Sequence, residues 1–509
     1  MRRSRAAAQP PQPGGGTGSR PEWGGNGVAE SASTKGGTRL YTETEKCSAR
    51  IRANAMSETE FFAREIEAWK HSAARLEQLR GADYYAGRQD ILQRERTAIG
   101  PGGRVTRVDN LPCHRVVDNQ YAKMVDQKVN YLLGRPLTFR TEDPALRAAL
   151  QQHCGPQFRR LLKHIGEDAL NGGIAWLYVA YDSTGALCFR HFPAHEILPF
   201  WADDAHTQLD AAARLWRQEL WEGPARKIVE RVELFLPDGL HRYILENGEL
   251  LEDTAHGACE PWITARAGGS VTGWNWQRLP LIAFRYDRHE TPLIRRVKSL
   301  QDGINALLSG LQNNMEEDAR NTILVLQNYD GENLGEFRYN LATYGAVKVR
   351  DDGGVQTLQV QVSAENYATV LELFKKALIE NARGFDAKDD RLAGNPNQLN
   401  IQSMYSDIDL DASGMETEFQ AALTELLWFV RQDLRTRGQP AEAPVEIIFN
   451  RDVLINEAEA ISSCAASVGL LSQETIVAQH PWVEDVEAEL ARIRGKSVTD
   501  VTEIILQSE

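Results

Sequence analysis

The chain has 509 residues, with 57 basic and 71 acidic side chains and a formal net charge of −14. A protein that reads DNA sequence is usually basic, with a stripe of Lys and Arg, so this composition excludes tight, sequence-specific DNA binding. The six cysteines (47, 113, 154, 188, 259 and 464) form no CxxC pair, which predicts free thiols rather than disulfides or a zinc site. No apolar run approaches the roughly 18 residues of a membrane span.

Residues 1–55 differ from the rest of the chain. They hold nine basic and four acidic residues, so their charge is +5 and that of the remainder is −19. They are rich in Gly, Pro, Ser and Arg without hydrophobic periodicity, which predicts disorder. A capped amphipathic helix is expected to follow Met56 and to extend to Leu79. We therefore hypothesise that Met56 is the biological start, which the intact mass of the native protein would test.

Residues 56–292 mix helical and extended patterns, which predicts an α+β domain. Long helices are expected at Arg115–Leu133, stopped by Gly134, and at Phe158–Asn171. The segment Val445–Phe449 is expected to return and complete the sheet of this domain. The strands expected in the sheet are 175–181, 187–192, 231–236, 240–246 and 281–285.

Three strongly periodic helices are predicted at 293–320, 363–384 and 412–438. The first carries an apolar stripe from Val297 to Met315 at spacings of three and four, which is typical of one buried helix face. Gly384 and Gly438 supply natural stops for the second and third. The simpler alternative is that they are core helices of an α-rich domain.

A small αβ insert, 321–362, separates the first two helices. Ile323–Leu326 and Leu358–Val362 have strand patterns, 334–344 has a short helical pattern, and Asp351–Gly354 has the composition of a hairpin turn. So small a unit needs neighbours to cover its core, which is a hint of oligomerisation.

The loop expected at 394–406, GNPNQLNIQSMYS, contains no charged residue but five Asn or Gln side chains. Lys or Arg would hold phosphates electrostatically, so an amide-rich surface suits light contact with a polyanion. The alternative is an ordinary polar loop.

Motifs of catalysis are sparse. There is no GxxxxGK[ST] phosphate-binding loop, and Pro193 between His191 and His195 argues against a shared metal-binding helix face. The enzymatic alternative rests on Asp407, Asp409 and Asp411, whose carboxylates would share one face of an extended segment and could bind Mg²⁺. Otherwise these acids simply favour the N-terminus of the third helix.

Six segments together carry a family resemblance: ADYYAGRQDIL (82–92), VVDNQYAKMVDQKVNYLLGRP (116–136), LPLIAFRYD (279–287), ILVLQNYDGENLGEF (323–337), YGAVKVRDDGGVQTLQ (344–359) and LLSQETIVAQHPWVEDVEAEL (470–490). Their order and spacing resemble the portal protein of tailed double-stranded DNA bacteriophages, of the long-tailed type. The resemblance extends over most of the chain, from about Met56 to about Gly495.

The resemblance implies a ring-shaped homo-oligomer, usually a dodecamer, at one capsid vertex. Double-stranded DNA is packaged through its channel and later ejected. It implies no enzymatic activity, cofactor or metal, because a separate terminase drives packaging. The other implied partners are scaffolding and major capsid proteins and a head–tail adaptor, in a virion assembled in the host cytoplasm and without membrane contact. The remaining alternatives are a metal-dependent DNA-processing enzyme and a capsid or connector protein that threads no DNA.

The fold class implied is an α+β, helix-rich, multidomain portal-type subunit. The expected DNA-facing residues of the tunnel loop are Asn395, Asn397, Gln398, Asn400 and Gln402, although Pro396 and these amides depart from the small apolar residues typical of the family. Lys348 and Arg350 are weaker candidates for contact with the motor or adaptor.

The resemblance also implies a domain map. It is 1–55 disordered, 56–292 wing, 293–320 first stem helix, 321–362 clip, 363–384 second stem helix, 385–411 tunnel-loop region, 412–438 long wing helix, 439–456 strand returning to the wing, and 457–509 helical crown and tail.

Overall fold

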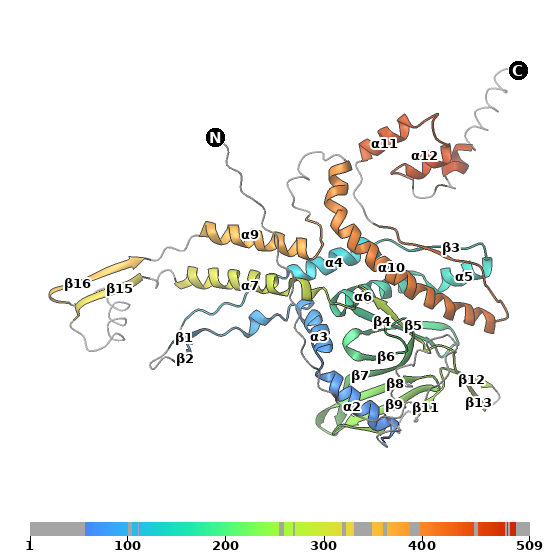
Figure 1. Cartoon of the computed structure of the whole chain (residues 1–509), viewed down its shortest axis with the longest axis horizontal. Helices are drawn as coiled ribbons and strands as arrows, with labels where there is room; N and C mark the ends of the chain where they lie inside the picture. Colours follow the sequence, from blue (N-terminus) through green and yellow to red (C-terminus); the bar gives the residue numbers. More distant parts are fainter. Residues whose placement is uncertain are drawn as a thin grey trace, which may run out of the picture. The chain divides into compact units, whose positions relative to one another are not determined.

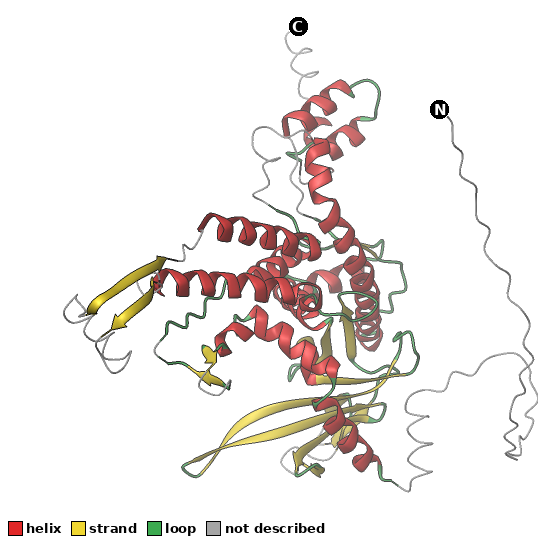
Figure 2. Ribbon diagram, turned by 60° about the vertical axis from the view of Figure 1, so that its left-hand side comes forward, coloured by secondary structure: helices red, strands yellow, loops and turns green. Residues whose placement is uncertain are grey.

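The computed structural model describes residues 56–99, 104–109, 111–253, 259–267, 270–317, 322–329, 349–359, 364–386, 398–451, 457–483, 486 and 489–494. All of them belong to one unit, Thr42–Glu509. Long helices and antiparallel sheets occur together (Figures 1 and 2), which confirms the α+β, helix-rich class. The expectation of disorder for 1–55 lies outside the described residues.

A three-stranded antiparallel sheet forms the centre of the main core. Its order is β14 (Leu281–Arg285), β4 (Ile174–Tyr181), β5 (Leu187–Pro193). Helix α6 (Pro156–Gly172) packs on β4 and β5, and the long helix α10 (Gln398–Thr436) packs on β14. Strand β4 is apolar on both of its faces, as is usual for a strand that is covered on both sides, and Trp176 is fully buried. The expected strands and the helix at 158–171 are confirmed, but the strands expected at 231–236 and 240–246 lie in a second sheet rather than in this one.

A second sheet is larger and is covered by the first described helix. Its order is β10 (Glu249–Glu252), β9 (Gly239–Glu246), β8 (Ala225–Leu236), β7 (Leu209–Glu222), β6 (Ile197–Trp201), with β11 (Cys259–Glu260) also pairing β9. Helix α2 (Glu58–Lys70) packs Ile66 and its aromatic neighbours on the face that presents Ala211 and Ala213. The intervening Ala212 belongs to the main core. Successive side chains of a strand point to opposite faces, so β7 contributes to the core under α2 with one face and to the main core with the other.

The helix expected to run unbroken from 57 to 79 is two helices. Helix α2 ends at Lys70, and α3 (Ala73–Tyr85) starts anew because the Ser72 side chain accepts a hydrogen bond from the Arg75 amide at 3.2 Å. The hydroxyl thus caps a second N-terminus.

Two expectations for the flanks of the main core are wrong. Helix α4 (Gln120–Leu133) begins five residues later than Arg115, because the preceding residues are extended and donate their amides to another helix. Strand β17 (Glu446–Ile448) does not join a large sheet: it pairs with β3 (Thr138–Arg140), next to α5 (Pro144–His153).

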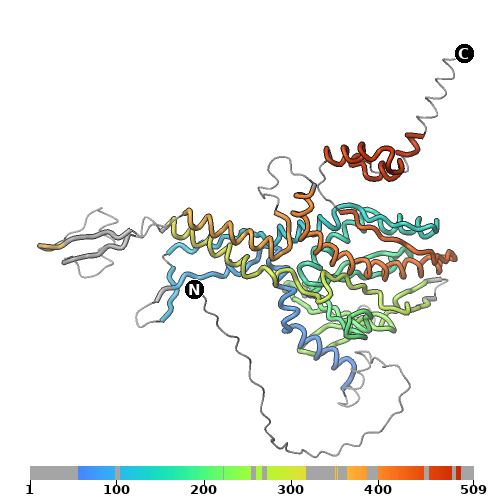
Figure 3. Tube along the Cα trace, turned by 45° about the horizontal axis from the view of Figure 1, so that its top comes forward, coloured from blue at the N-terminus to red at the C-terminus, as the bar shows by residue number. Residues whose placement is uncertain are grey.

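Helices α7 (Ile294–Glu317) and α9 (Ala364–Asn381) lie side by side and antiparallel (Figure 3). The Asn314 amide donates to the Tyr367 hydroxyl at 2.9 Å near one end, and Gly303 lies beneath Phe374 farther along. Both helices were expected. The apolar stripe of α7 is not buried along its whole length, since Met315 is 68% exposed.

Strands β15 (Thr322–Tyr329) and β16 (Val349–Gln359) form an antiparallel pair within the expected insert. Asp351–Gly354 does not turn the hairpin. It forms an irregularity inside β16, where the pairing shifts between Gln327 and Tyr329 and Asp352 adopts a positive φ of 63°. The composition that favours a turn thus favours a bulge here. The short helix expected at 334–344 lies outside the described residues.

Helix α10 begins at Gln398, so the expectation of a loop through Ser406 is wrong. The reason is an apolar stripe at helical spacing, in which Ile401, Tyr405 and Ile408 are buried. At its other end Gly438 has a φ of 75°, and the Gln439 amide donates to the Leu434 carbonyl at 2.9 Å, which confirms the expected stop.

The remaining elements are short. Helices α11 (Glu457–Ala466) and α12 (Gln473–Gln479) contact each other. Among the helices within the described ranges, none combines the length and the apolar character that crossing a membrane requires. The others are η1 (Asp90–Gln93), η2 (Ala194–Glu196), β1 (Thr97–Ile99) paired with β2 (Val105–Arg107), and β12 (Ile263–Ala267) paired with β13 (Ser270–Trp274).

Candidate functional site at the junction of the long helices

Helix α4 contacts α7, α9 and α10. Residues three and four apart on a helix lie on one face, and on α4 the residues Tyr121, Met124, Lys128 and Tyr131 occupy such a face and are all buried. Tyr121 bonds to α7, Met124 lies against Gly384 after α9, and both Lys128 and Tyr131 contact α10. The junction is therefore organised by one face of α4.

The first contact is a series of hydrogen bonds that we call the polar ladder. Every fourth residue of α7 from Gln301 to Asn313 is polar and fully buried. Their side-chain oxygens accept from backbone amides of the extended segment before α4 and, in the case of Gln301, from an amide in the first turn of α4. The pairs are Asn313 with His114 at 2.7 Å, Ser309 with Val116 at 2.9 Å, Asn305 with Asp118 at 3.0 Å, and Gln301 with Tyr121 at 2.9 Å.

The polar ladder can form because the axial repeat of a helix nearly matches that of an extended chain. Four residues of α-helix rise about 6 Å, and two residues of extended chain rise about 6.6 Å. The acceptors at 305, 309 and 313 therefore meet amides at 118, 116 and 114. These amides have no strand partner, and burying them without an acceptor would be costly. The segment can be extended because α7 supplies the hydrogen-bond acceptors that a neighbouring strand would otherwise provide.

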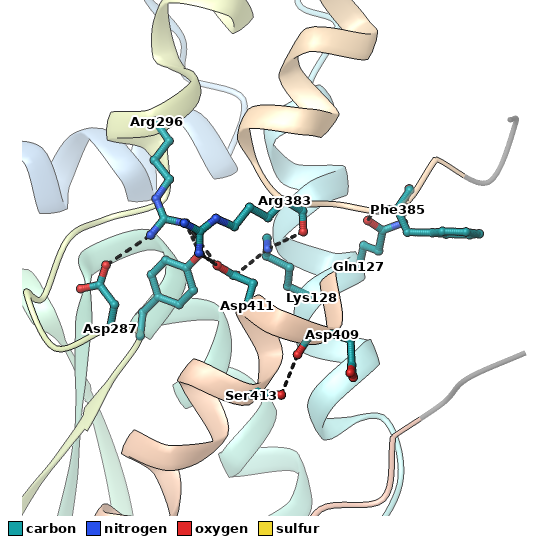
Figure 4. A network of polar contacts seen from close by, with 10 residues as sticks. Gln127, Lys128, Asp287, Arg296, Arg383, Phe385, Asp409, Asp411 and Ser413 are labelled. Atoms are coloured by element: carbon teal, nitrogen blue, oxygen red, sulfur yellow. Dashed lines mark hydrogen bonds and ion pairs between the residues drawn. The ribbon is translucent and has the colours of Figure 1, made fainter. Parts of the chain in front are cut away.

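The second contact is a buried ionic network around Asp411 of α10 (Figure 4). Its carboxylate receives the Lys128 ammonium and the Tyr286 hydroxyl, each at 2.7 Å. Two guanidinium groups approach its other oxygen, Arg296 of α7 at 3.2 Å and Arg383 after α9 at 3.4 Å. One carboxylate thus joins α4, α7, α10 and the short segment after α9.

Burial and charge act against each other in this network. Lys128 is 4% exposed and Asp411 is 8% exposed. Burial lowers the pKa of the Lys128 ammonium despite its carboxylate partner. Burial alone would raise the pKa of the Asp411 carboxyl, but Lys128 and the other donors hold it below its ordinary value. Burial also raises the pKa of Tyr286 well above its usual range, so its hydroxyl remains a donor. Asp411 is therefore a carboxylate fully engaged by donors.

The third contact holds the two ends of segment 387–397. The Gln127 amide donates to the Phe385 carbonyl at 2.7 Å and accepts from the Phe385 amide at 2.8 Å. The Phe385 ring stacks on Tyr405 of α10 at 4.3 Å between centroids, and Tyr405 lies 5.9 Å from Tyr131 of α4. The residues on either side of 387–397 are thus brought together on α4.

Gly384 has a different role from the one expected. The left-handed residue that ends the α9 region is Arg383, with a φ of 52°. A Cβ on Gly384 would lie 2.6 Å from the Met124 sulfur and 3.1 Å from the Gln127 side-chain oxygen. Glycine is required there for close approach to α4.

The alternative of a metal-binding face at Asp407, Asp409 and Asp411 is wrong. These residues lie on a helix, where residues two apart point in nearly opposite directions. Asp409 contacts Tyr131 and Arg451, whereas Asp411 contacts Lys128 and Asp407 is exposed. The structure therefore gives no common site for Mg²⁺ at these three carboxylates.

The structure separates the other expected site residues. Asn395 and Asn397, like Lys348 of the insert, lie outside the described residues. Gln398 is the first residue of α10, and Asn400 and Gln402 are exposed in its first turns. Arg350 is exposed on β16. His191 contacts Asp168 at 2.7 Å, and burial lowers the pKa of His195.

Several important residues escaped the sequence analysis. No sequence pattern marks Gln127, Lys128 and Arg383 as functional. The bonds of Gln127 with Phe385, and of Lys128 with Arg383 and Asp411, join residues more than 250 positions apart in the chain. The polar ladder did leave a signal. Gln301, Asn305, Ser309 and Asn313 repeat every four residues beside the apolar stripe of α7.

Sequence comparison assigns the chain to a protein family. The family model described as "Phage portal protein, SPP1 Gp6-like" matches residues 63–500. The chain belongs to this family. The portal protein of Bacillus phage SPP1 is 28% identical over 420 residues, covering 82% of each chain. That of Clostridium phage phiCD119 is 24% identical over 454 residues, covering 84% of this chain and 96% of the relative.

Two solved structures are also similar. The chain matches "Virion of native gene transfer agent (GTA) particle" with a TM-score of 0.40 and 12% identity, covering 69% of this chain and 87% of the other. It matches "Neck of native GTA particle computed with C12 symmetry" with a TM-score of 0.34 and 11% identity, covering 70% and 88%.

The portal assignment confirms the family expected from the six segments. This portal protein is a virion component of phage type, and its family is structural rather than enzymatic.

Proposed function

We propose that this portal protein assembles into a ring, most simply a dodecamer, whose channel conducts double-stranded DNA during packaging and ejection and which joins head to tail. The family match over residues 63–500 carries the proposal. Apolar side chains exposed on the helix pair support it. Leu373 is 60% exposed on α9 and Met315 is exposed on α7, as expected where a neighbouring subunit covers them.

In this proposal the domain map of the resemblance applies to the observed elements. Helices α7 and α9 are the stem, residues 321–362 the clip, and 56–292 the wing. Residues 385–411 form the tunnel-loop region, 412–438 the long wing helix, 439–456 the returning strand, and 457–509 the crown. The α7–insert–α9 order and the antiparallel α7–α9 pair support this map.

The DNA-facing set is proposed to be Asn395, Asn397, Gln398, Asn400 and Gln402. Support comes from the exposed positions of Asn400 and Gln402 directly after segment 387–397. The stretch 394–406 has no charge, so DNA would slide past it without strong counterion release. Clip residues Lys348 and Arg350 are proposed to face the terminase or the head–tail adaptor. Scaffolding and major capsid proteins are the other proposed partners, with assembly in the host cytoplasm and no catalytic role.

Electron microscopy and native mass measurement of the full chain test the ring. The wild type should form annular particles with a central hole. Leu373→Asp should reduce ring formation strongly, because a charge would be buried at the subunit contact, while circular dichroism stays unchanged. Leu251→Asp on β10, which also replaces a partly exposed leucine, is the matched control. Monomers in the wild type, with or without scaffolding protein, would contradict the ring.

A packaging assay tests the DNA-facing set. Asn400→Lys with Gln402→Lys should preserve rings but slow DNA translocation, because ammonium groups would bind phosphates. Thr424→Lys, at an exposed position farther along α10, is the control. Unaltered translocation by the double variant would contradict the assignment. Rings that assemble but never pass DNA would instead favour the non-threading connector.

A further inference from the structure

At the turn between β8 and β9, the side chain of Cys259 lies close to two side chains that precede it by about twenty residues, Asp238 and His241. Asp238 lies in the turn, His241 in β9, and Cys259 in β11. One ligand atom from each, a carboxylate oxygen, an imidazole nitrogen and the thiol sulfur, lies within 4.8 Å of the other two. The sequence predicted free thiols because none has a CxxC spacing. The β9–β11 pairing creates the cluster instead.

The backbone around this cluster is fixed by several contacts. His241 and Cys259 are directly opposed in the β9–β11 pairing. Gly239 has a φ of 142°, and a Cβ there would lie 2.5 Å from the Glu260 carbonyl oxygen, so the turn closely approaches β11. The Asn275 amide donates to the Asp238 carbonyl at 2.7 Å. The three side chains therefore project from a constrained frame.

The spacing of the ligand atoms fits a small divalent ion after a modest adjustment. The Asp238 carboxylate lies 3.1 Å from the His241 Nε2. Tetrahedral zinc would place oxygen and nitrogen about 3.3 Å apart, and nitrogen and sulfur about 3.6 Å apart. The carboxylate–imidazole edge therefore already has the required length. The thiol sulfur lies within 4.8 Å of the other two ligand atoms and must move closer to them, and the Asp238 side chain is 67% exposed and therefore has room to move.

We propose that Asp238, His241 and Cys259 form a Zn²⁺ site with three protein ligands and an open fourth position. Nitrogen and sulfur donors favour zinc over magnesium or calcium. The thiolate and carboxylate supply two negative charges to balance the ion, and the proton between Asp238 and His241 is displaced. The bound ion would join β11 to the β8–β9 turn, at the edge of the larger sheet.

Metal binding by the untagged full chain tests the proposal. After treatment with a chelator, the protein should bind one Zn²⁺ per chain in competition with a chromophoric chelator. Co²⁺ should bind with a thiolate-to-metal charge-transfer band. Cys259→Ser and His241→Ala should each lower Zn²⁺ affinity by about tenfold or more, and Cys259→Ser should remove the band. Cys188→Ser, which alters a thiol on β5, is the matched control and should bind normally.

Thermal unfolding gives a second measurement that does not depend on the dyes. Zn²⁺ in excess should raise the Tm of the wild type and of Cys188→Ser by mass action, but not that of Cys259→Ser. Variants that retain the wild-type circular dichroism establish that lost binding is not lost folding. Zinc bound equally by Cys259→Ser and His241→Ala, a wild type that binds no zinc, or Co²⁺ without a thiolate band would overturn the proposal.

Discussion

The helix junction and the larger sheet are stabilised in different ways. At the junction, α4 meets its neighbours through the polar ladder and the ionic network of Asp411. At the sheet, α2 packs apolar side chains such as Ile66 on alanines and leucines of β7 and β8. Hydrogen bonds are directional, whereas hydrophobic burial is not. The comparison teaches that the junction specifies helix position through individual atoms, and the sheet contact depends mainly on buried area.

The largest difference should appear at Asp411. Asp411→Asn keeps the side chain's shape but leaves Lys128 buried without its counter-ion, so we expect a loss of about 3–5 kcal/mol in the free energy of unfolding. Urea unfolding followed by tryptophan fluorescence measures it. Asp407→Asn, exposed on the same helix, should change stability by less than about 0.5 kcal/mol. Equal effects of the two variants would show that the buried ionic network does not stabilise the junction.

A rung of the polar ladder should matter less, but locally. Asn305→Ala leaves the Asp118 amide without its acceptor, which should cost about 1–3 kcal/mol. Hydrogen exchange at residues 114–121 should accelerate, while exchange in β7 and β8 should not. Gln312→Ala, exposed on α7, is the control. Unchanged exchange at 114–121 would show that water satisfies these amides and that the ladder is dispensable.

A conservative change at the sheet should be tolerated. Ile66→Val removes one methylene from a fully buried side chain, with an expected cost of about 1 kcal/mol. The same urea measurement applies. A loss as large as that of Asp411→Asn would mean that the α2 contact also depends on detailed fit.

Two glycines of α7 should respond with opposite signs. A Cβ at Gly303 would lie 2.6 Å from the Phe374 ring, whereas one at Gly310 would meet nothing within 4 Å. Gly303→Ala should therefore destabilise the chain by about 1 kcal/mol through overpacking. Gly310→Ala should stabilise it by up to about 1 kcal/mol through helix propensity. Thermal unfolding compares them, and the same sign for both would show that α9 does not pack closely on α7.

The sequence predicts the elements of this fold better than their contacts. Helices α7 and α9, the strands of the main core and the stop at Gly438 follow from periodicity and local turn chemistry. The start of α4 is predicted wrongly at Arg115, because the local sequence does not show that the amides before Gln120 bond to side chains of α7. The start of α10 was mispredicted because its Asn and Gln residues suggest a loop, while the stripe from Ile401 to Ile408 decides for a helix.

The candidate site was predicted only in part for a related reason. Family resemblance directed attention to the amides around 394–406, and composition could do no more. The residues that hold the ends of this region, Gln127 and Phe385, are 258 positions apart in the chain. From the sequence alone Asp411 is a possible metal ligand, because the three cationic side chains that neutralise it come from other segments of the chain. Only the tertiary structure shows that its charge is already balanced.

The polar ladder has one property that its individual bonds do not show. Its rungs are chemically alike and evenly spaced, so moving α7 by one turn would again place an oxygen acceptor opposite most of the same amides. A repeating interaction of this kind is degenerate: it fixes the direction of α7 but not its axial position. That position must come from contacts that do not repeat, such as those of Arg296 with the Asp411 carboxylate and of Asn314 with the Tyr367 hydroxyl.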